Sequence, residues 1–264
     1  MIATTHNHII AISNWWRLVW MTMGQLLAHY GRIGGRFAFI MALLEPLLLI
    51  GAIYIIRALW KMGSVSYGPS LFLFLASGFL PFYIFIHIST RTRTAVGRRG
   101  GFPRLSALDI YIATILVNTV VWITMTVVIF FGMWLSGIAQ ARPASIVNCA
   151  VPLLLLIALA MGVGMINNVI GRYFVLWLLI YRIATRGLIF LSGLIFIVDL
   201  EPLWMRVWSI ANPISHALTW FRLGVYGRYP HNFLDQGYLV EWALIALFLG
   251  FVLNRATIRS LDKG

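Results

Sequence analysis

Acidic residues are scarce in this sequence. Only 7 of its 264 residues are Asp or Glu, and charged residues of both signs make up 10%, against roughly 25% in soluble domains. So few carboxylates cannot solvate a surface, which excludes a soluble globular enzyme and an intrinsically disordered chain. The single cysteine, Cys149, lies within an apolar stretch and excludes a disulfide scaffold.

Motifs for nucleotide binding and catalysis are also absent. The two lysines, Lys61 and Lys263, stand outside any G-x-x-x-x-G-K-[ST] pattern, so the chain has no phosphate-binding loop of its own. Neither G-x-S-x-G nor H-E-x-x-H occurs. His6 and His8 do not complete a zinc site, so we expect no metal and no cofactor on this chain. If the protein uses ATP, the ATP and its Mg²⁺ are expected on a separate ATPase.

Long apolar runs make up most of the sequence. Hydrophobic residues make up 61% of the chain, and the mean hydropathy is +0.90. A helix of about 20 apolar residues crosses the roughly 30 Å hydrocarbon layer of a bilayer. The chain is therefore predicted to be an all-α polytopic membrane protein. Its six predicted transmembrane helices cover residues 37–56, 71–90, 108–135, 147–170, 176–198 and 238–254.

The Lys and Arg residues orient these spans. A net charge of +13 would suggest nucleic-acid binding in a soluble protein, but here the cations lie at the ends of apolar runs. Twelve of the twenty fall on one side of the predicted spans and six on the other. Because cytoplasmic loops carry the excess of Lys and Arg, both termini are predicted in the cytoplasm. We expect one membrane domain, residues 37–256, a cytoplasmic tail, residues 257–264, and no nucleic-acid partner.

The first 36 residues do not form a clean apolar run. Polar residues interrupt residues 9–30, and no small-residue cleavage site follows, so a cleavable signal peptide is not expected. Several tryptophans in this stretch favour an amphipathic helix in the cytoplasmic interface, turned into the first span by a cluster of glycines. A seventh, partly polar crossing is the alternative, and it would place the termini on opposite sides of the membrane.

The predicted cytoplasmic loop 91–104, RTRTAVGRRGGFPR, is strongly basic. It is compatible with a solvated or lipid-binding face and equally with a docking surface for a cytosolic subunit. Gly100, Gly101 and Pro103 would end a short helix there before the third span. Such a stub would protrude into the cytoplasm, where a motor protein could push on it.

Two cations lie inside the fifth predicted span. Arg182 and Arg186 are spaced i, i+4 and therefore share one helical face. They could offer an anionic substrate a positive strip along an internal passage. Alternatively, the span begins later, and both arginines reach up to cytoplasmic headgroups.

Residues 199–237 form a connector that is too apolar for a free loop. Asn212-Pro213 is typical of an N-cap followed by proline in the first helical position. The pattern predicts a periplasmic re-entrant helical hairpin, with one short helix entering, a turn at Asn212 and a second short helix returning. Its aromatic residues could stack on sugar rings or form the aromatic belt of the membrane interface.

Three stretches resemble the membrane subunit of type-two ABC exporters, most closely the capsular polysaccharide permeases of the KpsM-like branch. The first is Phe102-Pro103-Arg104, where the coupling helix of that family ends. The second is FLSGLIFIVDLEPLWMRVWSIANP, at the close of the fifth span. The third is NPISHALTWFRLGVYGRY, residues 212–229, in which Thr219 stands where the family often has a glutamate.

The resemblance implies a homodimer in the bacterial inner membrane, bound to two copies of a cytosolic ABC ATPase. It implies export of a lipid-linked polysaccharide through a channel between the two membrane subunits, with further periplasmic or outer-membrane export proteins as partners. Expected ATPase-coupling residues are Arg98, Arg99, Phe102, Pro103 and Arg104. Expected channel residues are Arg182, Arg186, Trp204, Trp208, Trp220, Arg222 and Tyr226, with Asn212 and Pro213 at the re-entrant turn.

Other functions are compatible with the same pattern. A permease of this fold could export O-antigen, teichoic acid or a small hydrophobic cargo. A membrane-bound lipid-carrier enzyme is a rival from another class, but it would need an acid and base cluster that the sequence lacks. A pure channel or structural protein is a third possibility.

Overall fold

The computed structural model describes residues 16–17, 19–21, 24, 38–59, 67–68, 70–95 and 107–261. Within this part of the chain the regular structure is entirely helical, which confirms the all-α class. The longer helices are α2 (Ala38–Leu59), α3 (Leu71–Ala95), α4 (Ala107–Leu135), α5 (Ile146–Tyr173), α6 (Trp177–Leu191), α7 (Leu203–Ala211), α8 (Pro213–Tyr226) and α9 (Gln236–Leu261). Short 3-10 turns, η3 (Ala139–Ala141) and η4 (Val198–Leu200), lie in the connections. Most of the predicted interfacial helix and all of residues 96–106 lie outside the described residues.

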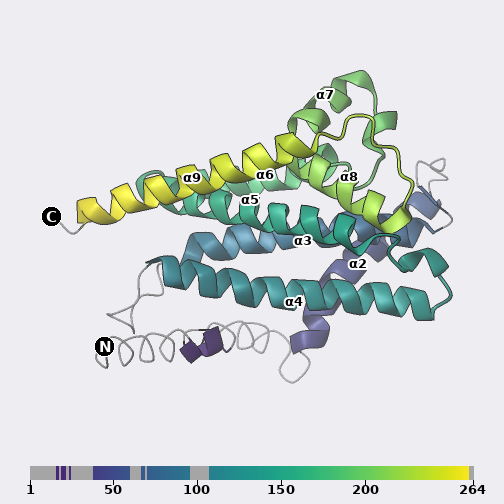
Figure 1. Ribbon diagram of the computed structural model, residues 1–264, viewed down its shortest axis with the longest axis horizontal. Helices are drawn as coiled ribbons and strands as arrows, with labels where there is room; N and C mark the ends of the chain where they lie inside the picture. Colours follow the sequence, from purple (N-terminus) through teal and green to yellow (C-terminus); the bar gives the residue numbers. More distant parts are fainter. Residues whose placement is uncertain are drawn as a thin grey trace.

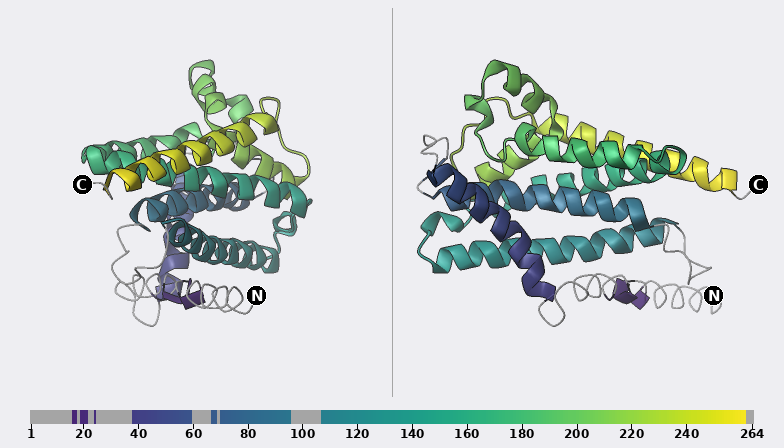
Figure 2. Two further views of the ribbon diagram at one scale, coloured as in Figure 1. Left: turned by 60° about the vertical axis from the view of Figure 1, so that its left-hand side comes forward. Right: turned by 180° about the vertical axis from the view of Figure 1, so that it is seen from behind.

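The long helices α3, α4, α5 and α9 lie side by side along the long axis of the molecule (Figure 1). Helix α2 crosses the bundle obliquely and contacts α3 (Figures 1 and 2). Helices α7 and α8 gather at one end of the bundle, and α9 runs from that end to the opposite one. We call these the α7–α8 end and the opposite end.

Four helical segments are long and apolar enough to cross a membrane: Leu71–Arg93, Asp109–Leu135, Ile146–Tyr173 and Gln236–Thr257. They match the second, third, fourth and sixth predicted spans. The first predicted span is helical as α2, which has 22 residues. The fifth differs from the prediction, because α6 has only 15 residues and ends at Leu191 instead of continuing to residue 198. Six complete crossings therefore stay a prediction.

Helix α5 is the centre of the bundle and packs against α3, α8 and α9. Small residues allow the close approach. A Cβ atom placed on Gly162 would lie 2.3 Å from the carbonyl carbon of Ala246 in α9, and one on Gly164 would lie 2.6 Å from the carbonyl oxygen of Ser89 in α3. Close backbone contact through glycine is a common basis of helix association in lipid, where the hydrophobic effect between helices is missing.

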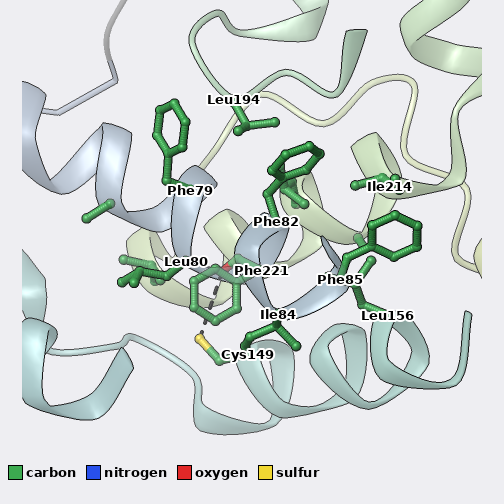
Figure 3. Close-up of a cluster of buried hydrophobic side chains, with 14 of the residues drawn as sticks. Phe79, Leu80, Phe82, Ile84, Phe85, Cys149, Leu156, Leu194, Ile214 and Phe221 are labelled. Carbon is green, nitrogen blue, oxygen red and sulfur yellow. Dashed lines mark hydrogen bonds between the residues drawn. The ribbon is translucent and has the colours of Figure 1, made fainter. Parts of the chain in front are cut away.

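The main hydrophobic core lies between α3, α5 and α8. Figure 3 shows aromatic side chains of α3 and aliphatic side chains of α5 and α8 packed around this centre. The Cys149 thiol on α5 points to α8 and donates a hydrogen bond to the Phe221 carbonyl oxygen, with 3.8 Å between sulfur and oxygen (Figure 3). The cysteine is thus a small buried core residue.

A buried polar cluster joins three helices toward the opposite end. The Tyr111 hydroxyl of α4 donates to Asn254 Oδ1 of α9 at 2.7 Å, and Asn168 Nδ2 of α5 donates to the Tyr111 oxygen at 2.8 Å. Asn254 Nδ2 in turn donates to the carbonyl oxygens of Met165 and Gly250. These bonds connect the beginning of α4 to α5 and α9.

Substituting Asn254→Leu is expected to lower the free energy of unfolding by about 1–2 kcal/mol, because it removes two interhelical hydrogen bonds of about 0.6 kcal/mol or more each. The substitution removes the acceptor for Tyr111 and the donor to Met165. Thermal unfolding of the purified protein in detergent measures this change. Tyr111→Phe removes one hydroxyl of the same cluster, so the two substitutions should be less than additive in the double variant. Full additivity would show that the cluster does not act as a unit.

Candidate functional site

Helix α6 ends at Leu191, in the middle of an apolar run. Gly193 has a φ of +67°, a backbone conformation that glycine adopts easily and that ends α6. The irregular residues that follow are nonetheless deep in the protein, since Ser192, Leu194 and Ile197 are buried. Irregular backbone at membrane depth requires partners from the protein for its carbonyl groups. The side chains of Asn212 and Arg222 supply them.

Arg222 of α8 is the hub of this arrangement and is 1% exposed. Its Nη1 donates to the Gly193 carbonyl at 2.5 Å and to the Tyr229 hydroxyl at 3.1 Å. Its Nη2 donates to the carbonyls of Leu194 at 2.7 Å and Phe74 at 3.2 Å, and its Nε donates to the Ser77 hydroxyl at 3.4 Å. A guanidinium has five N–H donors, so the site satisfies its full hydrogen-bonding capacity.

Helix α3 is shaped to receive this guanidinium. A Cβ atom on Gly78 would lie 2.5 Å from Arg222 Nη2, so only glycine leaves room there. The Phe74 ring lies 4.0 Å from the guanidinium carbon, which places the cation over an aromatic face. Arg222 therefore connects three separate parts of the chain: α3, the segment after α6, and α8.

The predicted cap at the start of α8 is confirmed. Asn212 Oδ1 accepts a hydrogen bond from the Ile214 backbone N–H at 3.0 Å, and Pro213 occupies the first helical position. The other end of the same side chain donates from Nδ2 to the Leu191 carbonyl at 3.0 Å and to the Ser192 hydroxyl at 2.8 Å. One residue therefore caps the start of α8 and satisfies the end of α6.

Acidic groups stabilise the η4 turn and α7. Asp199 forms an ion pair with Arg206 at 3.3 Å and also accepts from the Asn232 backbone N–H at 3.0 Å. Glu201 is buried and accepts from the Ser209 hydroxyl at 2.6 Å. Burial raises the pKa of Glu201, while the Ser209 hydrogen bond and nearby Arg206 act in the opposite direction.

His216 connects α8 by hydrogen bonds to the end of α7 and to the segment before α9. Its Nδ1 accepts from the Asp235 backbone N–H at 3.1 Å, so this nitrogen carries no proton. Its Nε2 faces the Ile210 carbonyl oxygen at 2.8 Å and must be the donor of that hydrogen bond. The neutral imidazole thus has one assigned tautomer, and the residue has a structural role.

The predicted channel residues divide into exposed and buried groups. Arg182 and Arg186 are exposed on one face of α6, with no ion pair among the described residues. Trp204 and Trp208 are exposed on one face of α7, which projects from the bundle in both views of Figure 2. These four side chains do not join the Arg222 hub.

The buried group consists of Arg222, Trp220 and the partly buried Tyr226. The Arg222 guanidinium is enclosed within the protomer by hydrogen bonds to carbonyl and hydroxyl oxygens, and its role along a passage stays a prediction. Trp220 is buried and packs in the core. Tyr226 is partly buried and lies 5.2 Å, between ring centres, from Tyr67, beside a cavity of about 570 Å³ that Gln140 and Arg228 also line.

The predicted coupling residues, Arg98 to Arg104, lie outside the described residues, so their role stays a prediction. The described residues on either side, at the end of α3 and the start of α4, lie at the opposite end from α7 and α8 (Figure 1). Among the residues around Arg222 that sequence reasoning missed are those on α3, which are Phe74, Ser77 and Gly78. An S-G pair in an apolar helix was the available signal, since it favours close packing.

Comparisons with known proteins cover most of the chain. Two polysialic acid transport proteins KpsM from Escherichia coli are each 27% identical over 241 residues, which is 88% of this chain and 89% of theirs. The capsule polysaccharide export inner-membrane protein CtrC from Neisseria meningitidis is 22% identical over 247 residues, 92% of this chain and 90% of its own. No family model matches the sequence. The chain is therefore similar, over nearly its whole length, to KpsM and CtrC, and the resemblance to KpsM-like permeases predicted from its sequence is confirmed.

Proposed function

We propose that this chain is the transmembrane subunit of an ATP-driven exporter that moves lipid-linked capsular polysaccharide, of acidic type, from the cytoplasm to the periplasm. The observation that carries the proposal is its similarity to KpsM and CtrC along nearly the whole length of each protein. The four long apolar segments agree with a multi-pass inner-membrane protein. ATP hydrolysis belongs to a separate subunit, because this sequence contains no phosphate-binding loop.

The proposed assembly is a homodimer with two ATPase subunits. Helix α6 supports it, because its outer face combines Arg182 and Arg186 with exposed Leu179 and Ile183. Cations at membrane depth are costly when they face lipid, so a passage between two copies is a better environment for this face. In this arrangement the α7–α8 end is periplasmic, both termini are cytoplasmic, and an anionic polymer passes along the arginines.

Deletion of the gene tests the proposed cargo. Surface and intracellular polysaccharide are assayed separately in the native cell, with and without the intact gene restored. Export predicts that polymer accumulates inside while the surface loses it, and that the restored gene reverses both changes. An unchanged capsule would remove the cargo and redirect the search to O-antigen, teichoic acid and lipids.

Arg186→Ala is expected to slow export about tenfold or more while leaving assembly unchanged. A hydrogen bond to a charged group contributes about 1.5–3 kcal/mol, which corresponds to this change in rate if the bond forms with the moving polymer. The rate of appearance of surface polymer measures the effect. Arg172→Ala, which removes an exposed arginine at the end of α5, is the matched control. Loss of the Arg186 variant from the membrane would instead make this residue structural.

The segment from Arg98 to Arg104 is expected to contact the ATPase, because the family resemblance places the end of the coupling helix there. Photocrosslinkers at Arg98 and Phe102 should yield adducts with the ATPase subunit in the assembled complex. Crosslinkers on the exposed face of α7, at Trp204 and Trp208, serve as controls from the proposed periplasmic end. Adducts from the α7 positions alone would refute the proposed orientation.

A further inference from the structure

A second cavity, of about 810 Å³, lies between α4 and α5 near the α7–α8 end. We call it the α4–α5 groove. Its floor is formed by buried Phe130, Cys149 and Phe221. The Phe130 and Phe221 rings meet edge to face, with 6.1 Å between their centres. The groove therefore extends from the surface down to Phe221 of α8, the residue before Arg222 in the chain.

Side chains of both helices line this space. On α4 the groove is lined by side chains that include Val127, Phe131 and Trp134. On α5 the facing positions include two small residues, Cys149 and Ala150. The connection through η3 joins the two helices at this end. The cavity between them has a mostly apolar lining.

The open side of the groove faces the surface of two apolar spans. Val127 is 60% exposed and Leu154 is 62% exposed, one on each rim. In a bilayer these rims contact hydrocarbon, so the groove does not fill with water. A hydrocarbon chain is the molecule that matches its apolar lining and its access from lipid.

One end of the groove carries a positive charge. Arg142, in the connection after η3, lines the cavity, is exposed and has no ion pair among the described residues. Trp134, at the end of α4, is the kind of residue found at the level of lipid headgroups. The geometry points to an amphipathic ligand with an apolar chain and an anionic head.

We propose that the α4–α5 groove binds one chain of an anionic phospholipid from the leaflet around the α7–α8 end, with the lipid phosphate on Arg142. The bound chain would contact Phe221 and so support α8 beside the Arg222 hub. This inference rests on the apolar spans and not on the identity of the cargo. It therefore stands or falls separately from the proposed export function.

The full-length protein in lipid nanodiscs provides the test. The probe is phosphatidylglycerol with a photoactivatable group at the end of one acyl chain, compared with the same chain on phosphatidylcholine. Crosslinks are expected in the peptides that contain Val127 and Leu154. Ala150→Trp fills the groove from its exposed side and should reduce these crosslinks about tenfold, the effect of removing about two methylene contacts. Ala256→Trp, at an exposed position on α9, should leave them unchanged.

A second set of variants tests the contact between Arg142 and the lipid headgroup. Arg142→Ala should reduce the preference for phosphatidylglycerol over phosphatidylcholine about fivefold, the effect of one cation near an anionic lipid. Arg228→Ala, which removes another exposed arginine at the same end, should not. Crosslinks that ignore Ala150→Trp would overturn the groove as the site. Displacement of the probe by lipid-linked polysaccharide alone, or a crosslink from Leu154 to a second copy of the chain, would assign the groove to another occupant and overturn the proposal.

Discussion

Replacing Arg222 by methionine is expected to destabilise the protein by about 3–5 kcal/mol and to deplete it from the membrane. Methionine fills a similar volume but leaves the buried carbonyl oxygens of Gly193 and Leu194 without the Arg222 donors. The segment after α6 would lose the bonds that hold it against α3. Protein level in isolated membranes and the thermal unfolding midpoint in detergent measure the loss.

Two further variants serve as comparisons for Arg222→Met. Arg222→Lys keeps the charge but cannot direct five N–H groups to the same oxygens, so it should recover only part of the stability. Arg228→Met, six residues further on, changes an exposed arginine and should have little effect. If Arg222→Met accumulates and unfolds like the unaltered protein while export alone fails, the hub is a cargo site and our structural assignment is wrong.

Substituting Gly162→Ala is expected to lower the free energy of unfolding by about 3 kcal/mol, the upper end of the range for overpacking. The added methyl group would lie 2.3 Å from the Ala246 carbonyl carbon and 2.5 Å from its oxygen. These are backbone atoms of a neighbouring helix, so no side-chain rotation relieves the contact. The helices α5 and α9 must separate along their interface. Thermal unfolding in detergent measures the change.

Gly132→Ala in α4 is the matched control. It is the same substitution in a helix, but a Cβ atom there meets nothing within 4 Å. It should raise stability slightly, by about 0.5–1 kcal/mol, because alanine favours the helix more than glycine does. Equal effects of the two substitutions would mean that the close approach of α5 and α9 does not hold the bundle together.

Local signals in the sequence were enough to predict the start of α8. Asn212 and Pro213 act on the backbone within two residues, and the observed cap agrees. Four of the six predicted spans likewise agree with long apolar helices, since length and hydropathy decide whether a helix can span a bilayer.

The break after α6 could not be predicted from hydropathy. Residues 192–198 continue the apolar run, so a window average extends the helix through them. Gly193 ends it, and the freed carbonyls are stable only because Arg222 arrives from 28 or 29 residues further along the chain. The neighbours of Arg222 in the sequence could not predict these contacts, because its partners on α3 and after α6 are distant in sequence.

Whether Arg182 and Arg186 face a second copy of the chain depends on the assembly, which the sequence of one chain does not specify. Their exposure on α6 is compatible with both interpretations made from the sequence, the polar strip and the contact with headgroups. Export by the Arg186→Ala variant separates the two, because an arginine that reaches headgroups contributes to membrane placement and an arginine on the passage contributes to transport rate.

Reconstituted transport tests the central claim most directly. Proteoliposomes containing this chain and its ATPase would be supplied with lipid-linked polysaccharide on the ATPase side, and polymer protected from an external glycosidase would be measured with and without ATP. The account predicts ATP-dependent protection that needs both proteins and is lost when the ATPase cannot hydrolyse ATP. Polymer that remains digestible with both active proteins present, in vesicles proven sealed, would contradict it.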